Sequence, residues 1–151
     1  MCADSLPPVA SEGRSTVIVL DTNILLDLWV FDDARAEGLR TALKAGQLQW
    51  LATTAMRDEL ERVLAYPQIV RSLQHHGRVA GQVLAQFDAL AQLRPVPPKA
   101  PVTCKDPDDQ MFIDLAVAHP GILLSKDNAV LSMQKRLAAL RVVAQATLPS
   151  V

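Results

Sequence analysis

Short, continuous apolar runs mark the predicted strands of this chain. Residues 16–20, 48–52 and 122–125 form such runs, and the first is followed directly by an acid, Asp21. Continuous rather than alternating apolar residues indicate strands that are buried on both faces, as in a parallel sheet. We further expect an edge strand at residues 142–144 and a short strand around Val96, within a proline-rich connector.

The segments between these runs carry apolar residues at helical spacing. They predict helices over residues 23–31, from Asp32 or Asp33 to Gly46, over 53–66, over 68–93 in two pieces broken near His76 and Gly77, over 106–119, and over 129–140. Because strands alternate with helices, the sequence predicts an α/β protein with three layers (α/β/α) and a mostly parallel central sheet.

Length and composition predict one domain in a reducing compartment. Residues 16–151 are long enough for a core, whereas residues 1–15 lack periodicity and predict a flexible N-terminal tail. Cys2 and Cys104 form neither a disulfide framework nor a zinc site. No secretory signal or membrane span is visible, so we expect a cytoplasmic protein without a membrane partner.

The charge balance argues against a protein that binds nucleic acid tightly over its whole surface. The formal net charge is −1 and aromatic residues make up 4% of the chain, so neither a basic footprint nor a base-stacking platform is present. An enzyme that contacts a few phosphates remains compatible with this composition.

Two acids follow predicted buried strands. Asp21 ends the first run, and Asp127 follows the run at residues 122–125. Parallel strands end at one edge of the sheet, where open α/β sheets bind their ligands, so these carboxylates are expected to be neighbours. The alternative is that each acid caps the helix that follows it.

Two further acids begin or border the apolar faces of helices. Glu59 lies at the margin of its helix's apolar stripe, while Asp58 and Arg62 fall on the opposite, solvated face. Asp106 and Pro107 suit a helix start, and Asp109 can either reach back in a capping box or begin the buried face.

Together these acids predict a site for Mg²⁺ or Mn²⁺. Carboxylates that crowd together repel one another unless a cation or a proton intervenes, and hard divalent ions prefer oxygen ligands. Such an ion polarises a phosphodiester and lowers the pKa of water. The chain has neither a glycine-rich phosphate loop nor a Gly-x-Ser-x-Gly elbow, and its three histidines lack partners at metal-binding spacing.

Four motifs in order resemble those of the PIN domain family. They are Val19-Leu20-Asp21-Thr22-Asn23, Glu59-Leu60-Glu61-Arg62-Val63-Leu64, Cys104-Lys105-Asp106-Pro107-Asp108-Asp109 with Ala116, and Leu124-Ser125-Lys126-Asp127. The resemblance covers roughly residues 16–148, and within the family it is to the group of toxin–antitoxin toxins.

The resemblance implies a metal-dependent ribonuclease acting on RNA. Carried over by position, the catalytic and metal-binding acids are Asp21, Glu59, Asp109 and Asp127, and the supporting residues are Asn23, Ser125 and Asp106. Lys126 stands where many members carry Arg or a small residue, and it could meet a phosphate. Members commonly form homodimers, and some bind an antitoxin protein.

Two other functions compete with this interpretation. A phosphatase of the haloacid-dehalogenase type would use the same strand-end acid, but its chemistry needs a second acid where this chain has Asn23. The other alternative is a catalytically silent module that binds RNA or protein on the same fold. RNA cleavage that depends on a divalent cation would separate the three.

Overall fold

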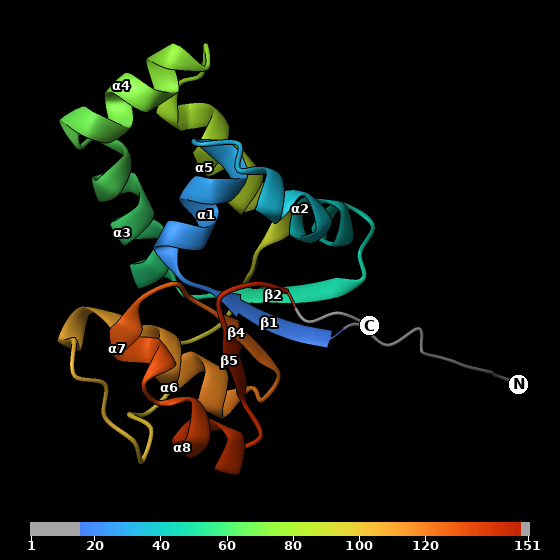
Figure 1. Cartoon of the computed structure of the whole chain (residues 1–151), viewed down its shortest axis with the longest axis vertical. Helices are drawn as coiled ribbons and strands as arrows, with labels where there is room; N and C mark the ends of the chain where they lie inside the picture. The colour runs from blue at the N-terminus through green and yellow to red at the C-terminus, as the bar shows by residue number, and fades with distance from the viewer. Residues whose placement is uncertain (1–15, 149–151) are drawn as a thin grey trace, which may run out of the picture.

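A five-stranded, all-parallel sheet forms the centre of the molecule (Figure 1). The structure, a computed structural model, describes residues 16–148. The strand order is β3-β2-β1-β4-β5. The strands are β1 (Thr16–Leu20), β2 (Leu48–Ala52), β3 (Gln92–Leu93), β4 (Ile122–Leu124) and β5 (Val143–Gln145). The predicted three-layer α/β fold is therefore confirmed.

Strand β1 lies in the middle and explains why its sequence is continuously apolar. Ile18 pairs with Trp50 of β2 on one side and with Ile122 of β4 on the other. Ile18 is completely buried, because neighbouring strands and helices cover it on every side. The chain proceeds from β1 outward to β2 and β3, then returns to place β4 on the other side of β1. The order of strands thus reverses between β1 and β4.

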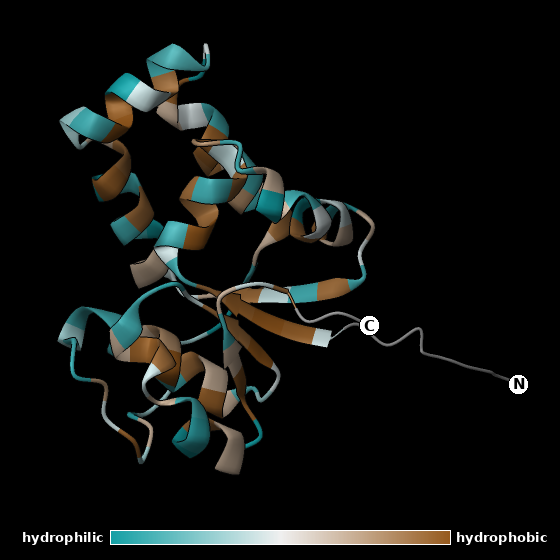
Figure 2. Cartoon of the chain, in the orientation of Figure 1, coloured by the Kyte–Doolittle hydropathy of each residue, from teal (hydrophilic) through white to brown (hydrophobic). Residues whose placement is uncertain are grey.

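Helices cover both faces of the sheet (Figure 1). One side carries α1 (Thr22–Trp29), the 3-10 helix η1 (Ala34–Ala36), α2 (Glu37–Lys44), α3 (Thr54–Leu64), α4 (Pro67–His75) and α5 (Ala80–Leu90). The other side carries α6 (Gln110–Ala118), α7 (Asn128–Leu131) and α8 (Gln134–Ala139), with the 3-10 helix η2 (Pro107–Asp109) before α6. Apolar residues concentrate in the strands and on the helix surfaces that face them (Figure 2).

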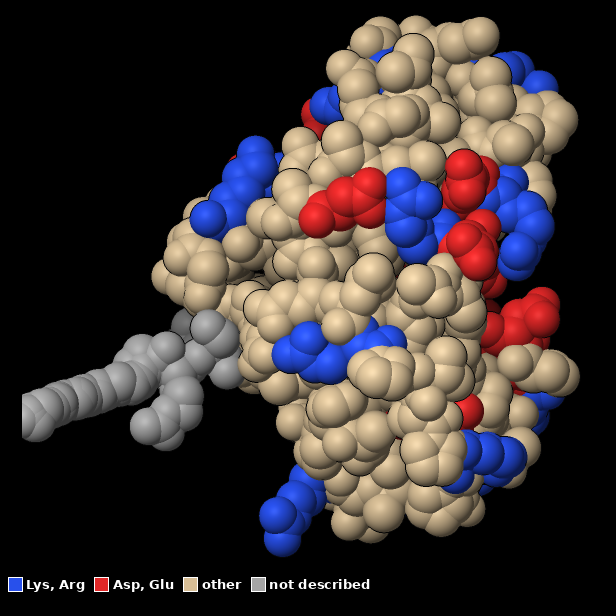
Figure 3. Space-filling model, turned by 180° about the vertical axis from the view of Figure 1, so that it is seen from behind, with Lys and Arg blue, Asp and Glu red and all other residues tan. Residues whose placement is uncertain are grey.

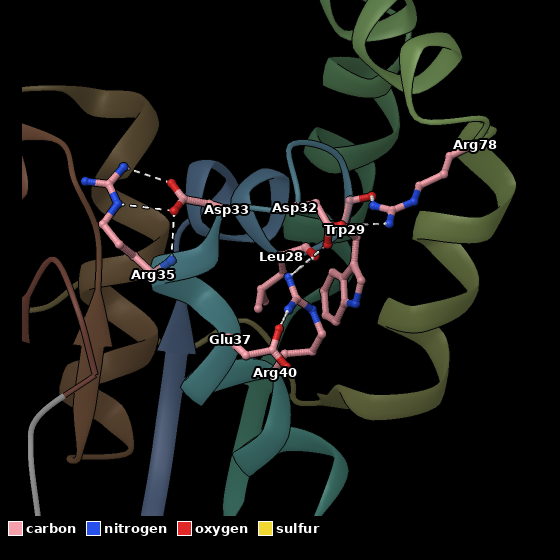
Figure 4. A network of polar contacts seen from close by, with 8 residues as sticks. All are labelled: Leu28, Trp29, Asp32, Asp33, Arg35, Glu37, Arg40 and Arg78. Atoms are coloured by element: carbon pink, nitrogen blue, oxygen red, sulfur yellow. Dashed lines mark hydrogen bonds and ion pairs between the residues drawn. The ribbon is translucent and has the colours of Figure 1, made fainter.

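Two arginines from other elements fix the C-terminal end of α1 (Figure 4). Arg40 Nη2 donates to the Leu28 carbonyl at 2.7 Å, and Arg78 Nη1 donates to the Trp29 carbonyl at 2.9 Å. Both guanidinium groups also lie 3.4 Å from the Asp32 carboxylate. The last carbonyls of a helix have no partner within it, so these arginines satisfy them in place of a glycine cap. Helix α1 is thereby held rigidly, and its other end begins at Asp21.

Close packing at the start of β4 requires a glycine. A Cβ atom at Gly121 would lie 2.3 Å from the Val17 carbonyl oxygen, which belongs to the backbone of β1. Only a residue without a side chain lets the chain enter β4 this close to β1. Gly46 after α2 and Gly77 after α4 instead have positive φ values of 74° and 65°, as the predicted helix ends require.

Two predicted elements differ from the structure. The short strand lies at Gln92–Leu93 rather than around Val96, because Pro95 and Pro97 lack the N–H groups that a ladder needs. The last predicted helix is two helices, α7 and α8, which both contact β5. The chain turns between them at Met133, whose side chain is completely buried. The predicted tail at residues 1–15 lies outside the described residues. Between residues 16 and 148, no helix is long and apolar enough to cross a membrane.

Candidate metal centre

Asp21 and Ser125 come together at the carboxyl edge of the sheet, where the strand order reverses. Asp21 follows β1 directly and Ser125 follows β4, and the Asp21 N–H donates to the Leu124 carbonyl at 3.0 Å. The helices after two such strands lie on opposite faces of the sheet, so a crevice opens between them. Asp21 is 4% exposed and Ser125 is completely buried, so the floor of the crevice is polar but largely shielded from water.

A chain of hydrogen bonds connects the two strand-end acids. Ser125 Oγ donates to Asp21 Oδ2 at 2.6 Å and accepts from the Asp127 N–H at 3.1 Å. Asp127 also caps α7, since one of its carboxylate oxygens accepts from the Ala129 N–H at 2.9 Å. Asp21 makes no such capping bond to α1, although it occupies the N-cap position. Helix capping therefore accounts for part of the Asp127 contacts, whereas the Asp21 carboxylate is held by Ser125, with the backbone N–H groups of Thr22 and Asn23 close to it.

Three carboxylates form the tightest acidic group of the described chain. Asp106, Asp109 and Asp127 each offer an oxygen, and these oxygens all lie within 4.8 Å of one another. Asp106 also caps η2, accepting from the Asp108 N–H at 3.0 Å, as the sequence predicted. Asp109 is 7% exposed, and its buried Oδ2 has no hydrogen-bond partner within residues 16–148. A buried carboxylate oxygen without a donor is costly, and a bound cation would satisfy it.

The proximity of these acids changes their protonation. Burial, a hydrogen bond shared with Asp127 and the charges of Asp21, Asp127 and Asp106 raise the pKa of Asp109 to about 8. Burial also raises the pKa of Asp21, with a further rise from Asp127 and an opposing effect of the Ser125 hydrogen bond. Without a cation, the site therefore retains a proton on at least one carboxyl group near neutral pH.

Glu59 lies outside the group of three and is oriented by a residue that the sequence analysis missed. The Thr22 hydroxyl donates to Glu59 Oε1 at 2.5 Å. Burial raises the pKa of Glu59, and the Asp21 charge adds to this, while the Thr22 hydrogen bond lowers it. Thr22 is buried at the start of the apolar helix α1, which is a signal that its hydroxyl needs a partner.

Thr22→Val is expected to impair the site without unfolding the protein. Valine has the shape of threonine but cannot donate a hydrogen bond, so Glu59 would lose its fixed orientation. Because hydrogen bonds to charged groups contribute about 1.5–3 kcal/mol, we expect any hydrolytic activity of the site to fall roughly tenfold or more. The half-saturating Mn²⁺ concentration should rise as well. Thr22→Ser keeps the hydroxyl and should restore both values; equal losses in the two variants would contradict this role.

The remaining predicted site residues are placed less centrally. Asn23 is exposed on the first turn of α1. Lys126 follows Ser125 on the same edge, but its ammonium lies 2.5 Å from the carboxylate of Asp27, a buried acid of α1. A phosphate contact by Lys126 stays a prediction, and it would require the lysine to exchange its partner.

The donor set fits a hard divalent cation. Asp106, Asp109 and Asp127 supply only oxygen atoms. Asp21 lies outside this group of three, but Ser125 links it to Asp127 by hydrogen bonds, and its charge contributes to the raised pKa of Asp109. Oxygen-only sites favour Mg²⁺, Mn²⁺ or Ca²⁺ over zinc, which prefers nitrogen and sulfur. The unpartnered Asp109 oxygen and the raised pKa of this carboxyl group have one explanation in common, which is that the site is built for a cation.

Comparison with known protein families agrees with this geometry. Residues 17–129 match the family model described as the PIN domain. The matched segment runs from the second residue of β1 past the end of β4, and it contains all of the acids discussed above. A search of curated proteins finds no match.

Proposed function

Since this chain belongs to the PIN domain family, we propose that it is a metal-dependent endoribonuclease that hydrolyses RNA phosphodiester bonds. The observation that carries the proposal is the group of Asp106, Asp109 and Asp127 at the carboxyl edge of the sheet, where the strand order reverses. Within this group the buried Asp109 Oδ2 has no hydrogen-bond partner among the described residues. A metal-dependent nuclease needs both a cation that offsets phosphate charge and a fixed set of ligands for it.

The proposed ligands of Mg²⁺ or Mn²⁺ are Asp21, Asp109 and Asp127, joined by Asp106, with Glu59 at the edge of the site. When bound, the ion polarises the phosphodiester and lowers the pKa of water. Ser125 holds the Asp21 carboxylate, and the surrounding burial limits competing water. Thr22 holds Glu59 by Oε1, which leaves Oε2 free to accept a proton during hydrolysis.

The competing functions fit these residues less well. A haloacid-dehalogenase-type phosphatase would need an acid at position 23, where the chain has an exposed asparagine. A silent RNA- or protein-binding module has no need to crowd carboxylates until the pKa of one reaches about 8, an arrangement that opposes folding. The binding module remains the second candidate, and the assay below distinguishes it.

The biological setting is proposed from the family resemblance. We propose that the protein is the toxin of a toxin–antitoxin pair, that it forms a homodimer and that it acts on RNA in the cytoplasm. Co-expression growth assays and light scattering would test the first two statements. The enzymatic proposal does not depend on either of them.

RNA cleavage by the purified protein is the decisive experiment. A labelled single-stranded RNA should be cleaved with Mg²⁺ or Mn²⁺ and should remain intact with EDTA. The products should carry 5′-phosphate and 3′-hydroxyl ends, which separates this activity from metal-independent ribonucleases that pass through the 2′-hydroxyl. If neither metal supports cleavage of any RNA offered, the binding-module function takes the lead.

A further inference from the structure

An open hollow lies beside the acidic group, between α3 and the start of α6. Its volume is about 350 Å³. Asp58, Glu59 and Arg62 of α3 line one wall, and Pro107, Asp108 and Met111 line the other. Glu59 connects the hollow to the site through Thr22, and Asp108 directly precedes Asp109. Asp58 and Arg62 are exposed, as the sequence predicted, and they border the same open hollow as Glu59.

Arg62 is the cation among the residues that line this hollow. Acidic residues gather in the indentation at the right-hand edge of the molecule, with basic side chains above it (Figure 3). The negative charges of Asp58, Glu59 and Asp108 would repel the phosphates of an incoming RNA chain. The positive charge of Arg62 offsets part of this repulsion. Its charge lowers the pKa of Glu59, which places the guanidinium close to that carboxylate.

The guanidinium of Arg62 is free to bind a ligand. Within residues 16–148 it makes no hydrogen bond and no ion pair, although Asp58 and Glu59 lie one turn earlier on the same helix. Arg57, also on α3, is held by two hydrogen bonds to Asp88 at 2.7 and 2.9 Å. Arg40 and Arg78 are committed to the end of α1. Arg62 thus keeps its donors available at the margin of the acidic group.

We propose that this hollow binds a phosphate of the RNA chain neighbouring the one that is cleaved, and that Arg62 donates to it. The proposal rests on the ribonuclease function proposed above. A guanidinium presents two parallel N–H groups that match phosphate oxygens, which a lysine cannot do. Pro107 and Met111 give the opposite wall apolar surface against which the attached ribose or base can pack.

Salt dependence of RNA binding tests this contact directly. We would measure binding of a short fluorescent single-stranded RNA to full-length Asp21→Asn, with and without Arg62→Gln, over a range of NaCl concentrations. Loss of one phosphate contact to a single strand should reduce the slope of log K against log salt by about 0.7. Affinity at low salt should fall roughly tenfold. In the otherwise wild-type enzyme, Arg62→Gln should raise KM more than it lowers kcat.

Two further variants make the result specific. Arg71→Gln removes an exposed arginine of α4 that does not line the hollow, so it should leave slope and KM unchanged. Arg62→Lys keeps the positive charge but not the two parallel N–H groups of a guanidinium. It should therefore keep the salt dependence of RNA binding and lose part of the affinity for RNA. The rise in melting temperature on adding Mn²⁺ should persist in Arg62→Gln, which would show that the acidic group is intact.

The outcomes separate this proposal from the proposed function. One outcome is that the wild type cleaves RNA while Arg62→Gln and Arg71→Gln have the same salt slope of RNA binding and the same KM. In that case Arg62 does not contact a phosphate, and the ribonuclease function stands. If the wild type neither binds nor cleaves RNA, both fall. A loss of the Mn²⁺ response in Arg62→Gln would also overturn the proposal, because Arg62 would then act through the acids rather than through RNA.

Discussion

Asp21→Asn should abolish RNA cleavage as completely as chelation by EDTA does. Asp21 is 4% exposed, follows the central strand and receives the Ser125 hydroxyl at 2.6 Å. Asparagine keeps the shape of the side chain but removes one negative charge from the cation site. Loss of a general base alone lowers rates by roughly 100- to 10,000-fold, and loss of the cation should exceed this range. The measurement is the initial rate of cleavage at saturating Mn²⁺.

The same variant should be at least as stable as the wild type when metal is absent. The pKa of Asp21 is raised by burial and by Asp127, so its ionised form opposes folding. Neutral asparagine relieves that repulsion, and the melting temperature in EDTA should stay equal or rise. Glu61→Gln, on an exposed part of α3, provides a charge-matched control that should retain activity. If identically purified wild type and Asp21→Asn cleave alike, the activity is contamination.

The sequence contained enough information for the fold class, and it led to a specific prediction for the position of the site. Strands buried on both faces show as continuous apolar runs, and the acid after each run must then lie at one edge of the sheet. Asp21, Asp109 and Asp127 could be placed by this logic, because each depends on one strand end or one helix face. The approach of Asp127 to Asp109, and of Asp21 to Ser125, follows from the strand order, which a pattern along the chain does not encode.

Contacts between distant side chains could not be predicted in this way. The Thr22–Glu59 hydrogen bond joins α1 to α3, and the Lys126–Asp27 ion pair joins the end of β4 to α1. Asp106 satisfied the requirements of a helix cap, so the pattern gave no reason to rank it with Asp109. In each case the partner is selected by packing of elements far apart in sequence, and periodicity carries no information about that packing.

Without metal, the protein should lose stability as the pH rises from about 5 to 8. The unfolded carboxyl of Asp109 titrates near 3.8, whereas its pKa in the folded protein is about 8. Between these values the folded state binds more protons than the unfolded state, so the free energy of unfolding falls with increasing pH. One proton corresponds to at most about 1.4 kcal/mol per pH unit. The raised pKa values of Asp21 and Glu59 act in the same direction.

Acids with lowered pKa values do not cancel this trend. Asp33, whose pKa falls to about 2 because Arg35 binds it, stabilises the fold above pH 4 and loses that contribution only as the pH falls further. Its effect is therefore constant across the window from 5 to 8. Melting curves in EDTA at closely spaced pH values would measure the slope, and Asp109→Asn should flatten it. A slope that is unchanged in Asp109→Asn would contradict the assignment.

Mn²⁺ should cancel most of this pH dependence. A cation binds the ionised carboxylates and displaces the proton that Asp109 otherwise holds, so its affinity rises with pH. At a hundred times its dissociation constant, an ion that binds only the folded state adds about 2.7 kcal/mol to the free energy of unfolding. The Mn²⁺-induced rise in melting temperature should therefore be larger at pH 8 than at pH 5.5.

This Mn²⁺-induced rise should shrink at both pH values in Asp109→Asn and in Asp127→Asn. Asp88→Asn, a change at an exposed acid of α5, should keep the full response. A response of equal size in all four proteins would place Mn²⁺ elsewhere on the molecule.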